Sequence, residues 1–441
     1  MSAAGLRAEG VTVRLKGHAV PVLARASLDL VPGEVVGVCG RSGAGKSTFL
    51  HVLAGLLPWA RPAVVEGAVI LNGEDITDLD PGQRAHLLSS CLDRPDAQLF
   101  LATPRHELAA ARRLHGRTPL LDEIGAALGL EPLLDRRVTE LSSGERQRVA
   151  LAVALAAAPR PVLLDEPTVH LDEDGVAGLL RVLAGVRRQG GAVLLSEQAG
   201  WRLAGVVDRW LELKGGTLVP CPAPQPPALT PPPGGNGGVI LEASALTVVR
   251  GGRTLFEGAA LSVRAGEVVL LSGPNGAGKS SLARVLAGHA AAAGGDLSVT
   301  SGRIRRPSGL ALLLPEANVQ LFGDSVAGEM ALARVDLDAA AEVLRAHRLE
   351  QLSGRAPWTL SRGERQRLVH AALDALQPSL MVVDEPGQGL DPVALADLTD
   401  LMGARAAAGR AYLIASHRRE LAAFAHRHLV ISEGGLAEAP P

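Results

Sequence analysis

The chain has 441 residues, more than a single hydrophobic core usually spans, so two or more domains are expected. Its formal net charge is −2, and its 44 basic and 46 acidic residues are interspersed, which argues against a nucleic-acid binder with its usual basic excess. No apolar run approaches the roughly 20 residues that cross a bilayer, and the first residues lack the apolar core of a signal peptide, so any work at a membrane would be that of a peripheral subunit.

The first element with recognisable chemistry is a predicted buried strand that runs into a glycine-rich turn. GEVVGVCG (33–40) continues into GRSGAGKST (40–48), which fits the Gly-x4-Gly-Lys-Ser pattern of a phosphate-binding loop. Backbone N–H groups of such a loop wrap phosphates, the lysine reaches the β- and γ-phosphates, and the serine ligates Mg²⁺. The candidate ligands of ATP are Gly40, Gly43, Gly45, Lys46, Ser47 and Thr48, and Ser47 is also a candidate metal ligand.

Two further elements follow in the first half. ELSSGERQR (140–148) opens a predicted amphipathic helix, and VLLDEP (162–167) is a predicted buried strand that ends in two acids. A carboxylate at the end of an apolar strand is costly to bury unless it serves a metal. We therefore expect Asp165 to hold Mg²⁺ and Glu166, which follows it, to polarise an attacking water.

The middle of the chain has a different composition. Residues 215–238, GGTLVPCPAPQPPALTPPPGGNGG, are rich in proline and glycine and contain no charged residue. Proline fixes φ and removes a backbone donor, so this segment is predicted to be an extended, semi-rigid spacer. The predicted organisation is a first domain at 1–214, a linker at 215–238 and a second domain at 239–441.

The second half repeats the elements of the first in the same order, which indicates a duplicated domain. The loop lysines Lys46 and Lys279 are 233 residues apart (279 − 46), and the strand-end acids Asp165 and Asp384 are 219 apart (384 − 165). GPNGAGKSS (273–281) supplies a second loop, with Gly273, Asn275, Gly276, Gly278, Lys279, Ser280 and Ser281 as candidate ATP ligands. Ser280 and Asp384 are its candidate metal ligands, and Glu385 is its candidate catalytic residue, expected to polarise the attacking water.

Each half alternates short Val/Leu/Ile runs with longer Ala/Leu/Arg-rich stretches. This alternation predicts α/β units on a mostly parallel sheet, with ligand sites at the carboxyl ends of the strands. The three cysteines, Cys39, Cys91 and Cys221, have neither disulfide nor metal-ligand spacing and are expected to be unpaired thiols in a reducing compartment.

The segments LSSGE and LSRGE resemble the Leu-Ser-Gly-Gly-Gln-like signature of the ABC ATPase superfamily. The resemblance covers both halves and implies two tandem P-loop NTPase domains, each with a mostly parallel sheet core and a helical subdomain. It implies ATP hydrolysis with Mg²⁺, coupled to transmembrane transport. In the family's head-to-tail pair, the signature of one cassette contacts the γ-phosphate held by the other, so the two cassettes are expected to pair within the chain. The candidate signature ligands are Ser142, Ser143, Gly144 and Glu145 in the first copy, and Ser361, Gly363 and Glu364 in the second.

The two copies depart from the family pattern. The family's histidine after the next strand corresponds to His417 in the second copy, whereas the same position in the first copy is Gln198. The family's Q-loop glutamine falls on Asp93 and Pro315, and the usual adenine-stacking aromatic falls near Leu15 and Arg250. In addition, Arg362 stands where a small signature residue is usual. Because Gln198 cannot carry a positive charge or relay a proton, the site with His417 and Glu385 is predicted to hydrolyse ATP faster than the site with Gln198 and Glu166.

A final resemblance concerns PDAQLF (95–100) and ANVQLF (317–322). Both are similar to the Asn-Pro-Asp-Asp-Gln-Leu-Phe segment of the ATPases of energy-coupling-factor transporters, which import vitamins and transition metal ions. This implies an integral membrane coupling subunit, a separate substrate-binding membrane subunit, and a peripheral place on the cytoplasmic face of the cell membrane, with no nucleic acid bound. The alternatives are a soluble, ribosome-associated double-cassette translation factor and the ATPase of another type of ABC transporter.

Overall fold

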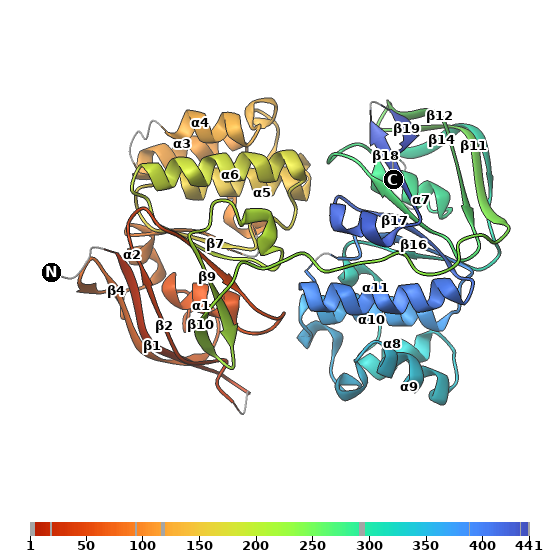
Figure 1. Ribbon diagram of the computed structural model, residues 1–441. Helices are drawn as coiled ribbons and strands as arrows, with labels where there is room; N and C mark the ends of the chain where they lie inside the picture. Colours follow the sequence, from red (N-terminus) through yellow and green to blue (C-terminus); the bar gives the residue numbers. More distant parts are fainter. Residues whose placement is uncertain are drawn as a thin grey trace. The chain divides into compact units, whose positions relative to one another are not determined.

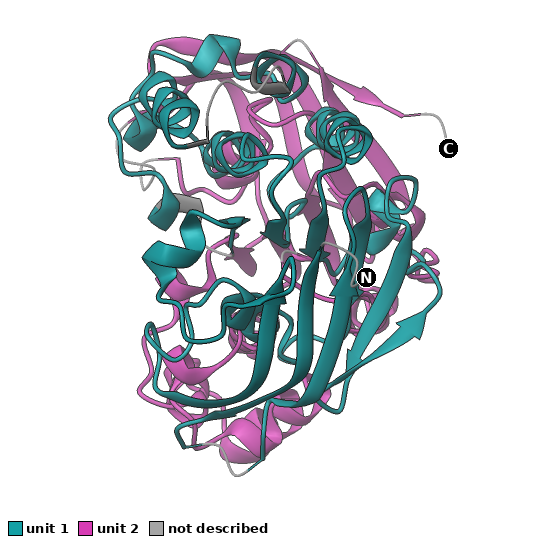
Figure 2. Cartoon of the chain, turned by 90° about the vertical axis from the view of Figure 1, so that its left-hand side faces the viewer, with its two compact units in different colours: residues 1–226 teal, residues 227–441 magenta. Residues whose placement is uncertain are grey.

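The computed structural model describes residues 5–17, 20–92, 95–115, 120–290, 296–387, 389–432 and 434–439. The chain divides into two compact units, residues 1–226 (unit 1) and 227–441 (unit 2), shown in separate colours in Figure 2. Each unit contains one six-stranded, largely parallel sheet and one smaller antiparallel sheet (Figure 1). The predicted α/β fold with two tandem copies is confirmed, and the antiparallel sheets are an addition that the alternating pattern does not predict.

Unit 1 builds its central sheet around a buried strand that precedes the first glycine-rich loop. The strands of unit 1 are β1 (Leu6–Leu15), β2 (Leu23–Leu30), β3 (Val35–Cys39), β4 (Ala63–Leu71), β5 (Glu74–Asp75), β6 (Ser89–Cys91), β7 (Val162–Asp165), β8 (Val193–Ser196), β9 (Arg209–Lys214) and β10 (Thr217–Cys221). Its helices are α1 (Lys46–Leu53), α2 (Pro81–Ala85), α3 (Pro104–His115), α4 (Leu120–Ala127), α5 (Ser143–Leu155) and α6 (Glu173–Arg188). The order of the six strands is β10-β9-β3-β8-β7-β6, with β3 parallel to both neighbours.

Both faces of this sheet are apolar, as expected for a parallel sheet that is covered on both sides. Val35 of β3 faces a cluster formed with α4, α5 and α6, whereas Val36 faces a second cluster formed with α1 and the antiparallel sheet. Figure 1 shows α3 to α6 gathered on one side of the sheet and β1, β2 and β4 on the other. This layering brings the carboxyl ends of β3 and β7, which precede Gly40 and Glu166, to one edge of the sheet.

Unit 2 repeats this plan. Its strands are β11 (Val239–Arg250), β12 (Arg253–Arg264), β13 (Val268–Ser272), β14 (Leu297–Arg305), β15 (Leu310–Leu313), β16 (Leu380–Asp384), β17 (Ala411–Ala415), β18 (Arg427–Ser432) and β19 (Gly435–Glu438). Its helices are α7 (Lys279–Leu286), α8 (Val326–Leu332), α9 (Leu337–Ala346), α10 (Arg362–Ala375) and α11 (Pro392–Ala407). The six-stranded order β15-β16-β17-β13-β18-β19 matches that of unit 1, with β13 in the place of β3.

The cores of the two units differ in one respect. In unit 1, helices α4 and α5 share a single apolar cluster with the sheet, through residues such as Leu128 and Leu155. In unit 2, the helices α8, α9 and α10 form a cluster of their own around Met330 and Leu368, apart from the cluster between the sheet and α11.

The proline-rich segment does not behave as an extended spacer over its whole length. Residues Thr217–Cys221 form β10, so unit 1 extends past Lys214, and the boundary between the units falls at Pro226 and Pro227, inside the predicted linker. Leu229 packs against the core of unit 2, and the buried Pro232 carbonyl accepts a hydrogen bond from Nε2 of His426 at 2.9 Å. The segment is therefore docked on both units, because its apolar residues find cores to pack against.

Among the described residues, no helix combines the length and the apolar character that crossing a membrane requires.

Candidate functional site

The two glycine-rich loops have the same backbone conformation. Gly40 and Gly273 have φ values of 141° and 146°, and the later glycines of each loop also lie at positive φ. A Cβ atom on Gly40 would lie 2.8 Å from the Leu213 carbonyl oxygen, and one on Gly273 would lie 2.7 Å from that of Ile431. Only glycine fits both the space and the dihedral angle. Each loop leads directly into a helix N-terminus, which is the geometry that favours a bound phosphate.

The loop lysines are held at these turns by backbone oxygens. Nζ of Lys46 donates to the carbonyls of Gly40 and Arg41 at 2.8 and 3.1 Å, and Nζ of Lys279 donates to those of Gly273 and Pro274 at 2.8 and 3.0 Å. Both side chains are more than nine-tenths buried. A buried ammonium group next to a ring of backbone N–H donors suits the phosphates of ATP, whose negative charge it would neutralise.

The strand-end acids fit a divalent cation. Asp384 ends β16, and its Oδ1 accepts a hydrogen bond from the Ser280 hydroxyl at 3.0 Å. Its Oδ2 is buried and has no hydrogen-bond partner among the described residues. In unit 1, Asp165 ends β7 and accepts from the Ser196 hydroxyl instead. Hard oxygen donors of this kind suit Mg²⁺, which Ser280 and Asp384 would hold in unit 2 and Ser47 and Asp165 in unit 1.

The glutamates that follow these acids have strained backbones. Glu166 and Glu385 have φ values of 47° and 54°, in the left-handed region that glutamate seldom occupies. Their N–H groups donate to the Ser196 and Ala415 carbonyls at 3.0 and 2.8 Å, which extends the sheet by one bond and fixes the turn. Such strain costs about 1–3 kcal/mol and is concentrated at functional sites. Its presence at the same position in both units supports a functional role for both side chains.

In unit 2 this glutamate has a histidine partner. Oε1 of Glu385 lies 2.8 Å from Nδ1 of His417 and accepts the His417 N–H at 3.2 Å, while Oε2 accepts the Ser416 hydroxyl at 2.7 Å. Burial acts to raise the pKa of Glu385, but His417 and Ser416 outweigh it and hold the pKa below its ordinary value. The carboxylate is therefore ionised and oriented, as a base for water must be.

In unit 1 the partner is neutral. The amide of Gln198 donates to Oε1 of Glu166, so the structure brings Gln198 to the place that His417 occupies in unit 2. Burial raises the pKa of Glu166 to about 7, and the neighbouring Asp165 and Glu197 carboxylates act in the same direction. The two units thus pair the same acid with chemically different partners.

Glu197 is a residue of the site that the motif search does not single out. It is 1% exposed, and its Oε2 accepts from the backbone N–H and hydroxyl of Thr168 at 3.2 and 2.8 Å. Its Oε1 accepts from the N–H groups of Gln198 and Ala199 at 2.9 and 3.2 Å. It therefore ties the turn after Glu166 to the turn that carries Gln198. The only sign of Glu197 in the sequence is that LLSEQAG has an acid at the position where unit 2 has Ser416.

The signature residues lie at helix starts. Ser142 is the N-cap of α5, and a capping box joins it to Glu145; Ser361 and Glu364 form the same box at the start of α10. The Glu145 carboxylate accepts from the Ser142 N–H at 2.7 Å and from Arg136 at 2.9 Å. Ser143, Gly144 and Gly363 lie in the first helical turns. The carboxylates of the signature glutamates are thus occupied in capping their helices. The group that would attract an anion at each signature is the helix N-terminus.

Two further departures from the family pattern concern the Q-loop positions and Arg362. Asp93 lies outside the described residues. Close to the other Q-loop position, Pro315, the side-chain amide of Gln320 bridges the Leu314 N–H and the Leu312 carbonyl at 2.7 and 2.9 Å. The side chain of Arg362 lies along Gly389, in the turn that follows β16.

The residues near the predicted adenine positions differ between the units. Leu15 is 7% exposed and belongs to the core, so it is not available to stack on a base. The side chains that lie against the loop glycine Gly45 are those of Val22 and Leu23, whereas in unit 2 Leu255 and Phe256 lie against Gly278. Arg250 is exposed at the end of β11.

Comparison with known proteins agrees with this geometry. A model of the ABC transporter family matches residues 23–169 and 256–388. A putative ABC transporter ATP-binding protein of Streptomyces avermitilis is 30% identical, over 97% of this chain and 92% of that protein. The putative HMP/thiamine import ATP-binding protein YkoD of Bacillus subtilis is 26% identical, over 95% of this chain and 88% of that protein.

Among solved structures, the archaeal ribosome recycling factor aABCE1, in complex with the ribosomal stalk protein aP1, has a TM-score of 0.69. The two sequences are 21% identical, and the match covers 96% of this chain and 89% of aABCE1. This likeness shows the fold alone. The family model matches both units and spans both phosphate-binding loops and both pairs of strand-end acids. The chain therefore belongs to the ABC transporter family and is an ATPase with two of the family's ATP-binding domains.

Proposed function

We propose that this ATPase powers an energy-coupling-factor type of ABC transporter, which takes up a vitamin or metal ion through separate membrane subunits. The observation that carries the proposal is a pair of exposed phenylalanines at equivalent positions. Phe100 is 83% exposed and Phe322 is 79% exposed, each directly after the Gln-Leu of its QLF element. The other three phenylalanines of the chain, Phe49, Phe256 and Phe424, are at most 3% exposed.

The geometry of the QLF elements explains how these rings are presented. Oε1 of Gln98 accepts the Leu92 N–H at 2.9 Å, and Gln320 holds the matching N–H of Leu314 at 2.7 Å. Each glutamine therefore anchors its loop to the end of a sheet strand, so the following ring projects from a fixed base. A large aromatic side chain on a fixed, exposed turn is typical of an interaction site. An apolar groove or helix of a membrane coupling subunit is the partner that we infer, on the cytoplasmic face of the membrane.

The relatives support the same assignment. The name of YkoD describes import of HMP and thiamine, and YkoD is similar to this chain over 95% of this chain and 88% of its own length. The solute itself would be bound by a membrane subunit, and the ATPase would not contact it.

ATP hydrolysis would occur at composite sites between paired cassettes. Lys279, Ser280, Asp384, Glu385 and His417 would act with Ser142–Glu145, and Lys46, Ser47, Asp165, Glu166 and Gln198 with Ser361–Glu364. Mg²⁺ would neutralise charge on the transferred phosphoryl group. Glu385 would accept the proton of the attacking water, and His417 would hold that carboxylate in place. Because Gln198 replaces the histidine at the other site, we infer that the site with His417 turns over faster.

A second candidate is a ribosome-associated factor, favoured by the fold shared with aABCE1. A co-purification separates the two. We would recover the full-length tagged chain from native membranes and identify its partners by mass spectrometry. The transporter assignment predicts a multi-span membrane subunit together with a small membrane-embedded binding protein. Ribosomal proteins without a membrane partner would overturn the assignment and favour the second candidate.

A matched set of variants localises the contact. Phe100→Ala combined with Phe322→Ala is expected to lose the membrane subunit while the isolated chain keeps its ATPase activity. Trp59→Ala serves as the control, because Trp59 is 70% exposed but lies outside the QLF elements. Equal recovery of the membrane subunit by all variants would contradict a docking role for the two rings.

A further inference from the structure

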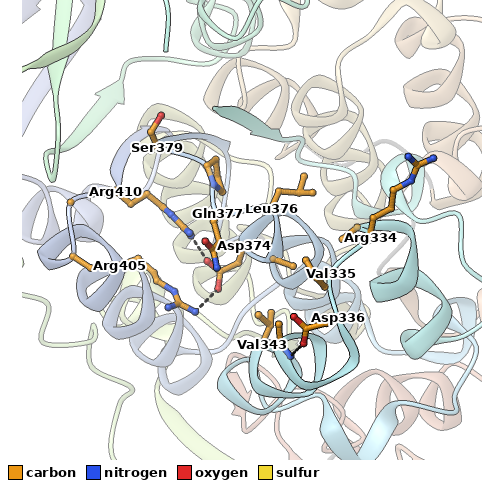
Figure 3. A pocket seen from close by; sticks show the side chains of 16 residues that line it. Arg334, Val335, Asp336, Val343, Asp374, Leu376, Gln377, Ser379, Arg405 and Arg410 are labelled. Atoms are coloured by element: carbon orange, nitrogen blue, oxygen red, sulfur yellow. Dashed lines mark hydrogen bonds and ion pairs between the residues drawn. The ribbon is translucent and has the colours of Figure 1, made fainter. Parts of the chain in front are cut away.

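Unit 2 contains a buried charged cluster near the start of β16, the strand that Asp384 ends. The carboxylate of Asp374, in the last turn of α10, is fully buried and contacts Arg410, Arg405 at 3.0 Å and His347 at 3.3 Å. Figure 3 shows Arg405 and Arg410 converging on Asp374 from one side. The two arginines come from the end of α11 and the turn that follows it, so the cluster joins α10 to α11.

Unit 1 shows that the fold does not need this cluster. The residues 219 positions earlier than Asp374, His347 and Arg405 are Leu155, Leu128 and Val186. All three are at most 1% exposed and belong to one apolar core. A buried ion pair is seldom more stable than apolar residues of similar volume. The charges of unit 2 are therefore better explained by a ligand than by stability.

A cleft of about 800 Å³ opens next to the cluster, a size in the range of small-molecule sites. One wall is apolar and comes from the α8–α9 side, with Val335, Ala339 and Val343. The opposite wall is polar and includes Asp374, Arg405, Arg410, Gln377 and Ser379. Ser379 directly precedes β16, whereas Asp384 ends that strand, so the cleft and the metal-binding acid lie at opposite ends of β16.

Hydrogen-bonding capacity in the cleft is unbalanced toward donors. Each guanidinium carries five N–H groups, whereas the carboxylate of Asp374 already accepts from three side chains. Nε of Arg405 is buried without a hydrogen-bond partner among the described residues, and the Arg405 side chain is 37% exposed. The other lining acid, Asp336, is occupied in capping α9 through the Ala339 N–H at 2.8 Å. In Figure 3, Arg334 extends away from Asp374.

A donor-rich cleft with two arginines and committed carboxylates requires an acceptor-rich ligand. We propose that this cleft of unit 2 binds a small oxyanion, a phosphate or a carboxylate compound, through Arg405 and Arg410. The bound anion would lie between the α8–α9 side and α11. It would also contact the end of α10, the helix that begins with the signature residue Ser361.

The test measures anion binding to the full chain by calorimetry, with inorganic phosphate and citrate as probes. The Lys46→Ala and Lys279→Ala substitutions serve as the background, because they weaken phosphate binding at the two glycine-rich loops. We expect one bound anion per chain in this background. Binding of phosphate alone would identify a phosphate compound as the ligand, and binding of citrate alone would identify a polycarboxylate.

Three added substitutions locate the site. Arg405→Gln is expected to weaken binding at least about tenfold, as for the loss of a charged hydrogen bond. Gln377→Glu, at an exposed residue of the polar wall, adds a negative charge and is expected to weaken binding several-fold without disturbing the core. Arg348→Gln removes an exposed arginine that pairs with Asp397 outside the cleft, and should leave binding unchanged.

Two outcomes would overturn the proposal. One is that neither probe binds in the background variant. The other is that Gln377→Glu and a folded Arg405→Gln both bind as tightly as the background variant. If Arg405→Gln fails to fold, Gln377→Glu decides alone.

Discussion

Nδ1 of His417 lies 2.8 Å from Oε1 of Glu385, whereas the equivalent Glu166 accepts a hydrogen bond from the uncharged amide of Gln198. A histidine partner supports the ionised glutamate and fixes its direction, and an amide supports it less. This difference makes the two halves of a duplicated enzyme chemically unequal.

We expect the inequality to appear in steady-state ATP hydrolysis. Glu385→Gln should lower kcat by at least about a hundredfold, since a positioned group at the reacting centre typically contributes a few kcal/mol. Glu166→Gln should lower kcat by less than about threefold, because the site that it serves contributes little turnover. Equal losses in the two variants would contradict the asymmetry, and retained ATP binding in both would exclude misfolding as the cause.

The effect of acid on unit 2 follows from His370. This histidine is 1% exposed, and neither ring nitrogen has a hydrogen-bond partner among the described residues. Burial lowers the pKa of His370 from 6.5 to about 3, so the unfolded chain takes up a proton at a higher pH than the folded one. Above pH 6.5 the histidine is neutral in both the folded and the unfolded chain. As the pH falls from 6.5 toward 3, only the unfolded chain binds the proton, so the free energy of unfolding decreases.

The matched variant for this prediction is His370→Leu, since unit 1 has Leu151 at the equivalent position in its core. Thermal unfolding at pH 7 and pH 5 should show a smaller loss of Tm in His370→Leu than in the parent chain. Asp374 also loses its stabilising charge in acid. Burial acts to raise the pKa of Asp374, but His347 and Arg410 outweigh burial and lower it, so this loss falls below pH 5. An identical loss of Tm in the two proteins between pH 7 and pH 5 would contradict the prediction.

The anchoring role of Gln320 predicts a local loss of stability. Gln320→Ala removes two hydrogen bonds and leaves the Leu314 N–H and the Leu312 carbonyl without their side-chain partner. We expect a cost of about 1–3 kcal/mol in the free energy of unfolding of unit 2. Faster amide hydrogen exchange confined to the loop around 314–322 would locate the effect. Unchanged exchange there would show that the loop does not depend on the glutamine.

The cysteines are expected to stay unreactive as thiols. Burial raises the pKa of both Cys39 and Cys91 to about 12, so almost no thiolate is present at neutral pH. Sγ of Cys39 lies 3.5 Å from Sγ of Cys221, and the two cysteines lie on β3 and β10, which are separated by β9. Slow alkylation of the native chain, with three fast-reacting thiols after denaturation, would confirm this. A Cys39–Cys221 disulfide formed under mild oxidation of the folded chain would contradict it.

The sequence alone determined the duplication, the α/β class and the two phosphate-binding loops. These features depend on local constraints, because glycines at positive φ, a lysine and a strand-end acid must follow one another at short, fixed distances in the chain. The same reasoning identified Gln198 as the counterpart of His417 in the first copy, since both follow the strand-end aspartate of their copy by the same number of residues.

Only the tertiary structure decided which side chains surround these motifs. Glu197 became part of the site because β7 and β8 are neighbours in the sheet, which joins turns that are about 30 residues apart in sequence. The glutamates of the two signatures proved to be capping residues, and the proline-rich segment proved to be docked through Leu229 and Pro232. The charged cluster around Asp374 was equally hidden in the sequence. Its members lie on three separate segments, and only their packing shows that they share one buried space, because burial and long-range contact are properties of the folded chain.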